Sequence, residues 1–100
     1  MARDRRTNTL MRIVYDEKFV SKLHVVWEYI AQDSKTRANT FKRELRLNIE
    51  NIPNFPYKYR RSTWFDFDNT RDLIFKGYTL PYAIYEDKII VLDIFKWTNH

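Results

Sequence analysis

A basic and aromatic segment in the middle of the chain contains the residues best suited to chemistry. The run Tyr57–Arg61 (YKYRR) places three cations within four positions, close to Phe55, Trp64 and Phe65. Cations neutralise phosphate groups and aromatic faces stack on bases, which is how proteins usually hold single-stranded RNA. The same composition suits aromatics that close the end of a hydrophobic core while the cations point to solvent. The residues alone leave both interpretations open.

Further cations are expected at the ends of predicted strands. Arg71, Lys76 and Lys96 occupy such positions, and Trp97 follows the last of them. If these side chains converge with the arginines of the YKYRR run on one face, they form a patch able to stabilise charge developing on a phosphate. Action on one phosphate requires these cations to lie within about 15 Å of one another.

The other polar residues do not indicate a metal or cofactor site. The chain has no cysteine, which excludes disulfides and thiolate metal sites, and its one glycine, Gly77, excludes the glycine-rich phosphate-binding loops. Asp66, Asp68 and Asp72 are close together, as in some magnesium sites. The alternation of phenylalanine and aspartate over residues 65–68 (FDFD) instead predicts aromatics facing inward and carboxylates facing water. We predict no cofactor and no metal.

Length and composition predict one small globular domain over residues 1–100. The chain has 100 residues, of which 44% are hydrophobic and 31% charged. Residues 1–10 contain almost nothing apolar and are expected to form a loose arm or an upstream extension before Met11. No apolar run approaches the roughly 18 residues of a membrane span, and no secretory segment follows the N-terminus. We therefore expect a cytoplasmic protein without membrane association.

The positive charge is concentrated in the middle of the chain. The net charge is +5, and residues 35–61 alone contain eight basic and two acidic side chains. This distribution indicates a polyanion or an acidic protein segment as a partner. The alternative is a solvated helix face followed by a basic loop.

Two stretches show helical periodicity. Asp16 is a suitable N-cap for a helix to about Gln32, and Asp33-Ser34 for a second helix that Pro53 ends. The short connection between them predicts an antiparallel hairpin. Their apolar stripes are Phe19, Leu23, Val26, Trp27 and Ile30 in the first helix, and Ala38, Phe41, Leu45, Ile49 and Ile52 in the second.

The rest of the chain predicts a sheet. The predicted strands are Leu10–Tyr15, Arg71–Lys76, Tyr78–Glu86 and Lys88–Lys96, with an ordered loop over residues 54–69 and turns at Gly77 and at residues 86–87. The nearly continuous apolar run of the last strand is typical of a central strand. Pro81 indicates a bulge or an edge in its own strand. The fold class is therefore α+β, in the order β-α-α-β-β-β, with an N-terminal helical hairpin packed on a mainly antiparallel sheet.

This order, together with two segments, resembles the RelE/ParE superfamily of bacterial type II toxins. The first segment, Trp27–Ser62, is similar to the family's helix pair, proline-containing loop and basic corner. The second, Arg71–Lys96 (RDLIFKGYTLPYAIYEDKIIVLDIFK), is similar to its Arg-x-Leu strand, its paired tyrosines and its closing hydrophobic strand. The resemblance covers most of residues 11–96.

The resemblance implies a toxin that arrests growth until a cognate antitoxin neutralises it. ParE-like members poison DNA gyrase, whereas RelE-like members cleave mRNA on the ribosome without a metal. Residues 48–52 lack the paired lysines of many nuclease members, and only four residues follow Lys96, so the ParE-like branch is favoured. An endoribonuclease is the alternative, and whether the chain is an enzyme stays open. A non-toxic basic nucleic-acid-binding domain is a second alternative.

Site residues follow from the resemblance and the charge pattern together. A nuclease would use Arg60, Arg61, Arg71, Lys96 and His100 as its catalytic residues. Contacts to nucleic acid or to a protein target are expected from Lys58, Tyr59, Arg60, Arg61, Arg71, Lys76, Lys96 and Trp97. An acidic, partly disordered antitoxin is expected to contact Arg37, Arg43, Arg46 and Arg61, and operator DNA is expected to be bound only through the complex with that antitoxin.

Overall fold

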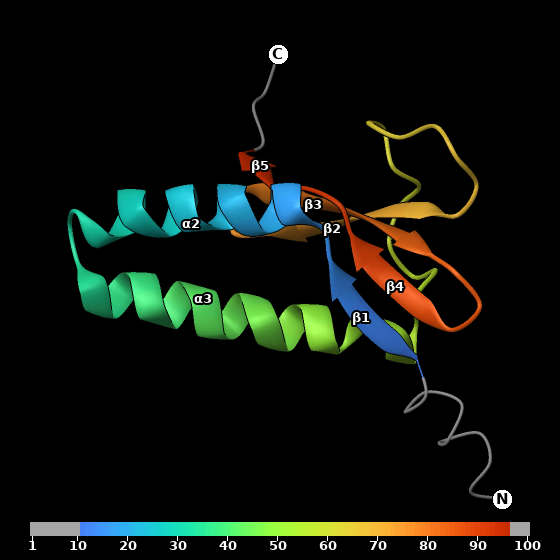
Figure 1. Cartoon of the computed structure of the whole chain (residues 1–100), viewed down its shortest axis with the longest axis horizontal. Coiled ribbons are helices and arrows are strands. Elements are labelled where there is room, and N and C mark those ends of the chain that lie inside the picture. Colours follow the sequence, from blue (N-terminus) through green and yellow to red (C-terminus); the bar gives the residue numbers. More distant parts are fainter. Residues whose placement is uncertain (1–10, 97–100) are drawn as a thin grey trace, which may run out of the picture.

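The computed structural model describes residues 11–96, so the predicted arm and the candidate residues Trp97 and His100 lie outside the described residues. The described chain is a helical hairpin packed on a mixed sheet (Figure 1), as predicted for the α+β class. The elements are β1 (Arg12–Tyr15), α2 (Glu17–Ala31), α3 (Lys35–Glu50), the 3-10 helix η1 (Ile52–Asn54), β2 (Thr70–Phe75), β3 (Tyr78–Ile84), β4 (Lys88–Val91) and β5 (Phe95–Lys96).

Both helices begin at the residues that the sequence predicts. The Asp16 carboxylate accepts a hydrogen bond from the Lys18 amide at 2.8 Å, and the Ser34 hydroxyl accepts one from the Arg37 amide at 3.0 Å. Each side chain satisfies an amide that the first helical turn leaves without a partner. Pro53 lies in η1, directly after the end of α3, as expected for a residue that cannot continue a helix.

The sheet has the strand order β1-β4-β3-β2, and β5 also pairs with β3. The β1–β4 pair is parallel and the other pairs are antiparallel. β4 lies between β1 and β3, which confirms that its apolar run belongs to an internal strand. Lys76 and Gly77, with φ angles of 48° and 84°, form the two-residue turn between β2 and β3.

The prediction of one continuous strand over Lys88–Lys96 is wrong, because the structure divides it into β4 and β5. The Leu92 amide still donates to the Pro81 carbonyl at 2.9 Å. In an antiparallel pair the N–H and C=O of one residue point to the same neighbouring strand. Pro81 has no N–H, so it cannot donate a second hydrogen bond back to Leu92. The Asp93 carboxylate then accepts a hydrogen bond from the Ile94 amide at 2.8 Å, which turns the backbone away from the ladder. The bulge or edge predicted in the strand of Pro81 is therefore wrong: β3 is continuous and internal, and the interruption lies in the neighbouring strand.

Asp93 also connects this interruption to α2. Its carboxylate is nearly buried and lies 2.8 Å from the Lys22 ammonium and 3.6 Å from the Lys18 ammonium. Since a buried carboxylate is costly without a partner, these lysines hold the first half of α2 against the sheet.

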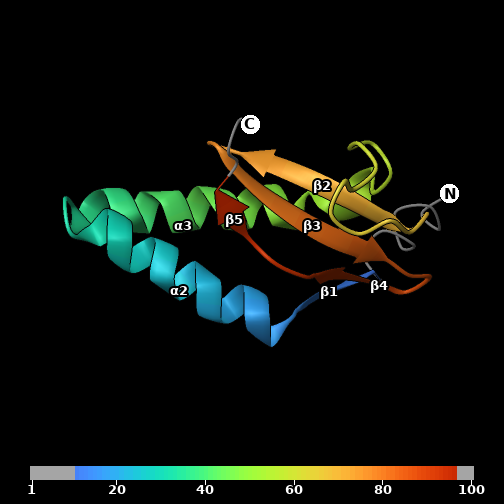
Figure 2. The ribbon, with the colours of Figure 1, turned by 90° about the horizontal axis from the view of Figure 1, so that it is seen from above.

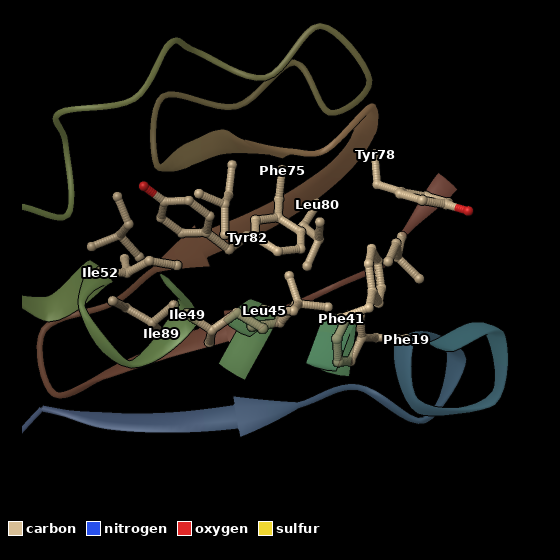
Figure 3. Close-up of a cluster of buried hydrophobic side chains, with 14 residues drawn as sticks. Phe19, Phe41, Leu45, Ile49, Ile52, Phe75, Tyr78, Leu80, Tyr82 and Ile89 are labelled. Carbon is tan, nitrogen blue, oxygen red and sulfur yellow. The ribbon is translucent and has the colours of Figure 1, made fainter. Parts of the chain in front are cut away.

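One face of the sheet and α3 enclose the hydrophobic core. Figure 3 shows the row of buried side chains between α3 and the strands, with Phe41 in contact with both Phe75 and Tyr78 at ring-centroid distances of 5.3 and 5.4 Å. From α2 only Phe19 is buried, and the rest of its predicted stripe is partly exposed. No helix within residues 11–96 is long and apolar enough to cross a membrane.

Replacing Asp93 by asparagine (Asp93→Asn) is expected to lower the free energy of unfolding by about 2 kcal/mol, because hydrogen bonds to charged groups contribute about 1.5–3 kcal/mol. The asparagine oxygen can still accept from the Ile94 amide, so the loss reports on the lysine contacts. Urea unfolding measures the change. The control is Asp87→Asn, which removes an exposed pair with Arg12 and should change stability by less than about 0.5 kcal/mol. Equal effects of the two variants would contradict this role for Asp93.

Candidate functional site

The predicted loop after η1 is attached to the sheet at several points. The Tyr82 hydroxyl donates to the Pro56 carbonyl at 2.6 Å, and the Asp72 amide donates to the Arg60 carbonyl at 3.1 Å. Arg61 of this loop also forms a single antiparallel bridge with Arg71 of β2. The cations of the loop are therefore presented by an ordered segment at the β2 edge of the sheet (Figure 2).

Arg60 is paired with a buried carboxylate. Its guanidinium lies 3.3 Å from Asp72, whose side chain is 0% exposed, and the Thr63 amide donates to the same carboxylate oxygen at 3.3 Å. Because the charge of Asp72 needs compensation in the protein interior, Arg60 has a structural role. Asp72 faces away from the helices, under the loop.

Arg61 is held more loosely. It is exposed and lies 3.4 Å from Asp66 and 3.0 Å from Asp68, and both carboxylates are almost fully exposed. Exposed pairs of this kind contribute little to stability, so an anionic ligand can replace either carboxylate. Asp66 and Asp68 are thus partners of Arg61, and Asp72 is the partner of Arg60. Within residues 11–96 no group of three potential metal ligands is found.

Arg71 points back toward the loop. Its guanidinium lies over the Tyr57 ring at 4.9 Å and donates to the backbone carbonyls of Asp68 and Thr70 at 2.8 and 2.9 Å. Lys58 lies over the ring of its neighbour Tyr59 at 5.2 Å. The cations of this corner are thus distributed among separate aromatic, carbonyl and carboxylate partners.

Lys76 and Lys96 lie at the opposite end of the sheet. In the strand register, Arg71 of β2 lies opposite Tyr82 of β3. On the other side of β3, Lys96 of β5 lies opposite Tyr78. Four residues along a strand and two strand spacings correspond to about 13 Å and about 10 Å, so the Cα atoms of Arg71 and Lys96 are about 16 Å apart. Figure 3 shows the hydroxyls of Tyr78 and Tyr82 pointing outward at opposite ends of the core.

The head groups of these lysines also have their own partners. The Lys76 ammonium lies 2.6 Å from Glu44 of α3, and this hydrogen bond, with the attraction between the charges, lowers the pKa of Glu44. The Lys96 ammonium lies over the rings of Tyr29 and Tyr78. The structure therefore divides the predicted cations into two groups that do not converge on one point. The loop corner contains Lys58, Arg60, Arg61 and Arg71, and the distal pair is Lys76 and Lys96.

The loop corner exposes several large aromatic side chains. The sequence suggests either stacking on bases or closure of the core for these residues. Trp64 packs edge-on against Phe95 at 4.6 Å, yet it remains mostly exposed. The mostly exposed aromatics of this segment are Phe55, Tyr57, Trp64 and Phe67, so the prediction that Phe67 faces inward is wrong. Aromatic residues beside arginines are typical of protein-binding surfaces, so this corner is a candidate interaction surface.

A second feature, which the sequence analysis missed, is an apolar groove of about 470 Å³ between β1, α2 and α3. The partly exposed stripe of α2 forms one wall, and Lys42 and Arg46 of α3 lie on the other. Burial raises the pKa of Tyr15 in this groove, the nearby Glu50 raises it further, and Arg46 opposes the shift. The signal in the sequence was Val20, an apolar residue of α2 outside the predicted stripe, which is 52% exposed in the structure. The groove residues are Tyr15, Phe19, Val20, Leu23, His24, Trp27, Lys42, Leu45, Arg46 and Ile49.

The arginines expected to meet an antitoxin lie in different places. Arg46 lines the apolar groove, and Arg43 is exposed on the same helix. Arg37 lies 3.8 Å from Asp33 and lines a second cavity, on the side of Lys96. Arg61 belongs to the loop corner.

Comparison with known proteins agrees with this architecture. Residues 13–97 match the family model described as the ParE toxin of the type II toxin–antitoxin system parDE. The chain belongs to this ParE toxin family. A solved structure of the chromosomal ParDE toxin–antitoxin system from P. aeruginosa is similar in fold, with a TM-score of 0.72 and 12% sequence identity over 89% of this chain and 98% of that chain. A search of curated proteins finds no match.

Family membership confirms the predicted resemblance and fold class. It also implies that this ParE toxin has a cognate antitoxin, since the family is one component of a two-component system. The exposed loop corner and the apolar groove lie on different elements, so they are two separate surfaces of the molecule.

The role of Asp72 is testable through its asparagine variant. Asp72→Asn should lower the free energy of unfolding by about 2 kcal/mol, because it weakens the charge-assisted hydrogen bonds that this carboxylate accepts from Arg60 and from the Thr63 amide. Hydrogen exchange should also become faster at the amides of residues 60–65. Asp66→Asn is the matched control, since its nearly fully exposed carboxylate should contribute less than about 0.5 kcal/mol. Unchanged exchange in Asp72→Asn would contradict a role for this carboxylate in holding the loop.

The attachment of the loop through Tyr82 predicts a pH dependence. Burial raises the pKa of Tyr82, and the neighbouring Tyr59 and Asp72 raise it further against the effect of Arg71. The folded state therefore retains this proton more strongly, so the contribution of Tyr82 is complete below the unfolded pKa of about 10 and is lost at higher pH.

Tyr82→Phe should thus lower stability by about 1 kcal/mol at pH 7, through loss of the hydrogen bond to Pro56. It should also reduce the decline in stability above about pH 10. Urea unfolding between neutral and alkaline pH measures both effects, with the exposed Tyr57→Phe as control. A decline in Tyr82→Phe as steep as in the unmodified chain would show that Tyr82 does not carry this dependence.

Proposed function

We propose that this ParE toxin arrests growth by binding a protein target, DNA gyrase, in the cytoplasm until its antitoxin neutralises it. The observation that carries the proposal is the separation of the cations. Arg60 compensates Asp72, Arg71 is bound to the loop backbone, and Lys96 lies at the far end of the sheet. A ribosome-dependent nuclease needs several cations around one phosphate, and this arrangement supports docking over cleavage.

The loop corner is the proposed target-binding surface. Its exposed aromatics belong to the same segment as Arg61, whose exposed carboxylate partners are easily replaced by those of another protein. Aromatic and arginine side chains often contribute most of the binding energy at protein interfaces. The choice of gyrase follows the ParE-like branch of the family.

The antitoxin is proposed to bind the hairpin side of the molecule. An amphipathic segment of the antitoxin can place apolar side chains in the groove and acidic ones beside Lys42 and Arg46. A segment that folds on binding can cover a large area, and the positive charge of residues 35–61 favours an acidic one.

The proposal is tested by inducing the toxin in a host without antitoxin and pulse-labelling DNA and protein. DNA synthesis should fall first, with an SOS response and intact mRNA. Purified toxin should inhibit supercoiling by gyrase. An early fall in protein synthesis, with mRNA cut at ribosome-occupied codons, would establish the nuclease alternative instead. Normal growth after induction of folded toxin would support a non-toxic nucleic-acid-binding domain.

Variants locate the surface in the same gyrase assay. Phe55→Ala and Phe67→Ala should each weaken inhibition by about tenfold or more, as expected for an aromatic residue that contributes strongly to an interface. Arg61→Lys should retain most activity, because docking needs its charge and not a bidentate fork. Val25→Ala on α2 is the matched control, since Val25 and Phe67 are both 63% exposed. A severe loss in Arg61→Lys, with full activity of Phe67→Ala, would contradict this surface.

A further inference from the structure

We infer that the cavity between α2, α3, the β2–β3 turn and β5 binds the carboxylate side chains of an acidic segment from a protein partner. This cavity has a volume of about 330 Å³ and is called the Lys96 cavity below. It is separate from the apolar groove, with which it shares no lining residue. Its lining residues are Tyr29, Ile30, Asp33, Arg37, Thr40, Phe41, Lys76, Tyr78 and Lys96.

Cations from three separate segments line the Lys96 cavity. Arg37 comes from α3, Lys76 from the turn after β2, and Lys96 from β5. Segments far apart in the sequence thus bring positive charge to one cavity. Figure 2 shows β5 and the end of the β2–β3 hairpin beside the helical hairpin. Concave sites with walls of low dielectric strengthen the attraction of such charges for anions.

Lys96 is the cation available to a ligand. Asp33 lies near Arg37, and Glu44 is hydrogen-bonded to Lys76, so each of those cations has an acidic partner. Among the ion pairs within residues 11–96, Lys96 takes part in none. Its ammonium lies 5.9 Å from the ring centroid of Tyr29 and 6.0 Å from that of Tyr78. Two aromatic rings restrain the side chain without neutralising its charge, which reduces the entropy lost on binding an anion.

The walls of the cavity favour a peptide over a nucleic acid. Ile30 and Phe41 give it an apolar side on which the stem of a glutamate or an adjacent apolar residue can pack. Nucleotides would need an accessible aromatic face for their bases. Tyr78 is buried, and its ring meets Phe41 edge-on at 5.4 Å, so this ring belongs to the core. The other tyrosine of the cavity, Tyr29, is exposed, but the Lys96 ammonium lies over its ring at 5.9 Å from the centroid and competes with a base for that face. Acidic side chains of a protein therefore fit the site best.

The identity of the partner rests on the proposed function, under which the acidic segment belongs to the antitoxin. The carboxylate site itself does not depend on that function. An antitoxin segment bound at both the groove and the Lys96 cavity would hold the two sides of the helical hairpin. Two linked contacts of modest strength give a much higher combined affinity than either alone.

The test uses the full-length toxin and a capped six-residue peptide of four glutamates around two leucines. Titration followed by ¹H–¹⁵N NMR should shift the amides of Tyr29, Thr40 and Tyr78. Lys96→Gln should weaken binding by about fivefold, as expected for one partly exposed ion pair. Lys96→Arg should retain binding, because it keeps the charge over the two rings.

The matched control is Lys88→Gln. Lys88 also lies over a tyrosine ring, that of Tyr85 at 5.7 Å, but it belongs to β4 and does not line the cavity. Its loss should change the affinity by less than about twofold. The glutamine version of the peptide should not bind.

Three results would overturn the inference. These are no peptide-induced shifts at the cavity, an equal loss of affinity in Lys96→Gln and Lys88→Gln, or displacement of the peptide from these residues by a single-stranded oligonucleotide. None of them depends on gyrase or on growth arrest. Failure of the carboxylate site is thus distinguishable from failure of the proposed function.

Discussion

The buried carboxylate of Asp93 is the interaction on which much of this small fold depends. It lies where the strand ladder beside Pro81 is interrupted, and its pairing with Lys22 attaches α2 to the sheet. The interruption lets β5 pair with β3 beside Tyr78, which brings Lys96 to the hairpin side of the molecule (Figure 2). α2 buries only Phe19 fully, and its other apolar contacts with the core come from the partly buried Leu23, Val26 and Ile30, so the ionic contact adds to a partial apolar attachment. The partial attachment leaves both the groove and the Lys96 cavity open.

Charge compensation separates structural cations from available ones. Arg60 is committed to a carboxylate with no access to water, whereas Arg61 has exposed partners and Lys96 has aromatic ones. The desolvation penalty makes the first kind of pair costly to break, while the other cations can exchange partners at little cost. A basic surface of this kind can bind acidic proteins at several points without assembling a phosphate-cleaving centre. This division is consistent with a toxin that acts by docking.

Most of the fold could be predicted from local signals in the sequence. Asp16 and Ser34 were identifiable as caps, Pro53 as the end of a helix and Gly77 as a turn, because each acts on the backbone within a few residues of itself. The division of the last strand was not predicted. The residues around Asp93 are almost all apolar, and the pairing partner that Pro81 fails to provide lies on another strand. Pro81 did signal an interruption, but not in which strand it would occur.

The sequence by itself determined the helical hairpin, the antiparallel hairpins and the concentration of cations in the middle of the chain, because periodicity, capping and net charge are properties of neighbouring residues. Only the tertiary structure decided which cations meet. Asp72 and Arg60 are 12 positions apart and Lys76 and Glu44 are 32 apart, so their pairing depends on how the loop and α3 pack on the sheet. The distance between Arg71 and Lys96 likewise depends on strand register. Long-range packing therefore turned a basic composition into separate surfaces, and no local pattern encodes that division.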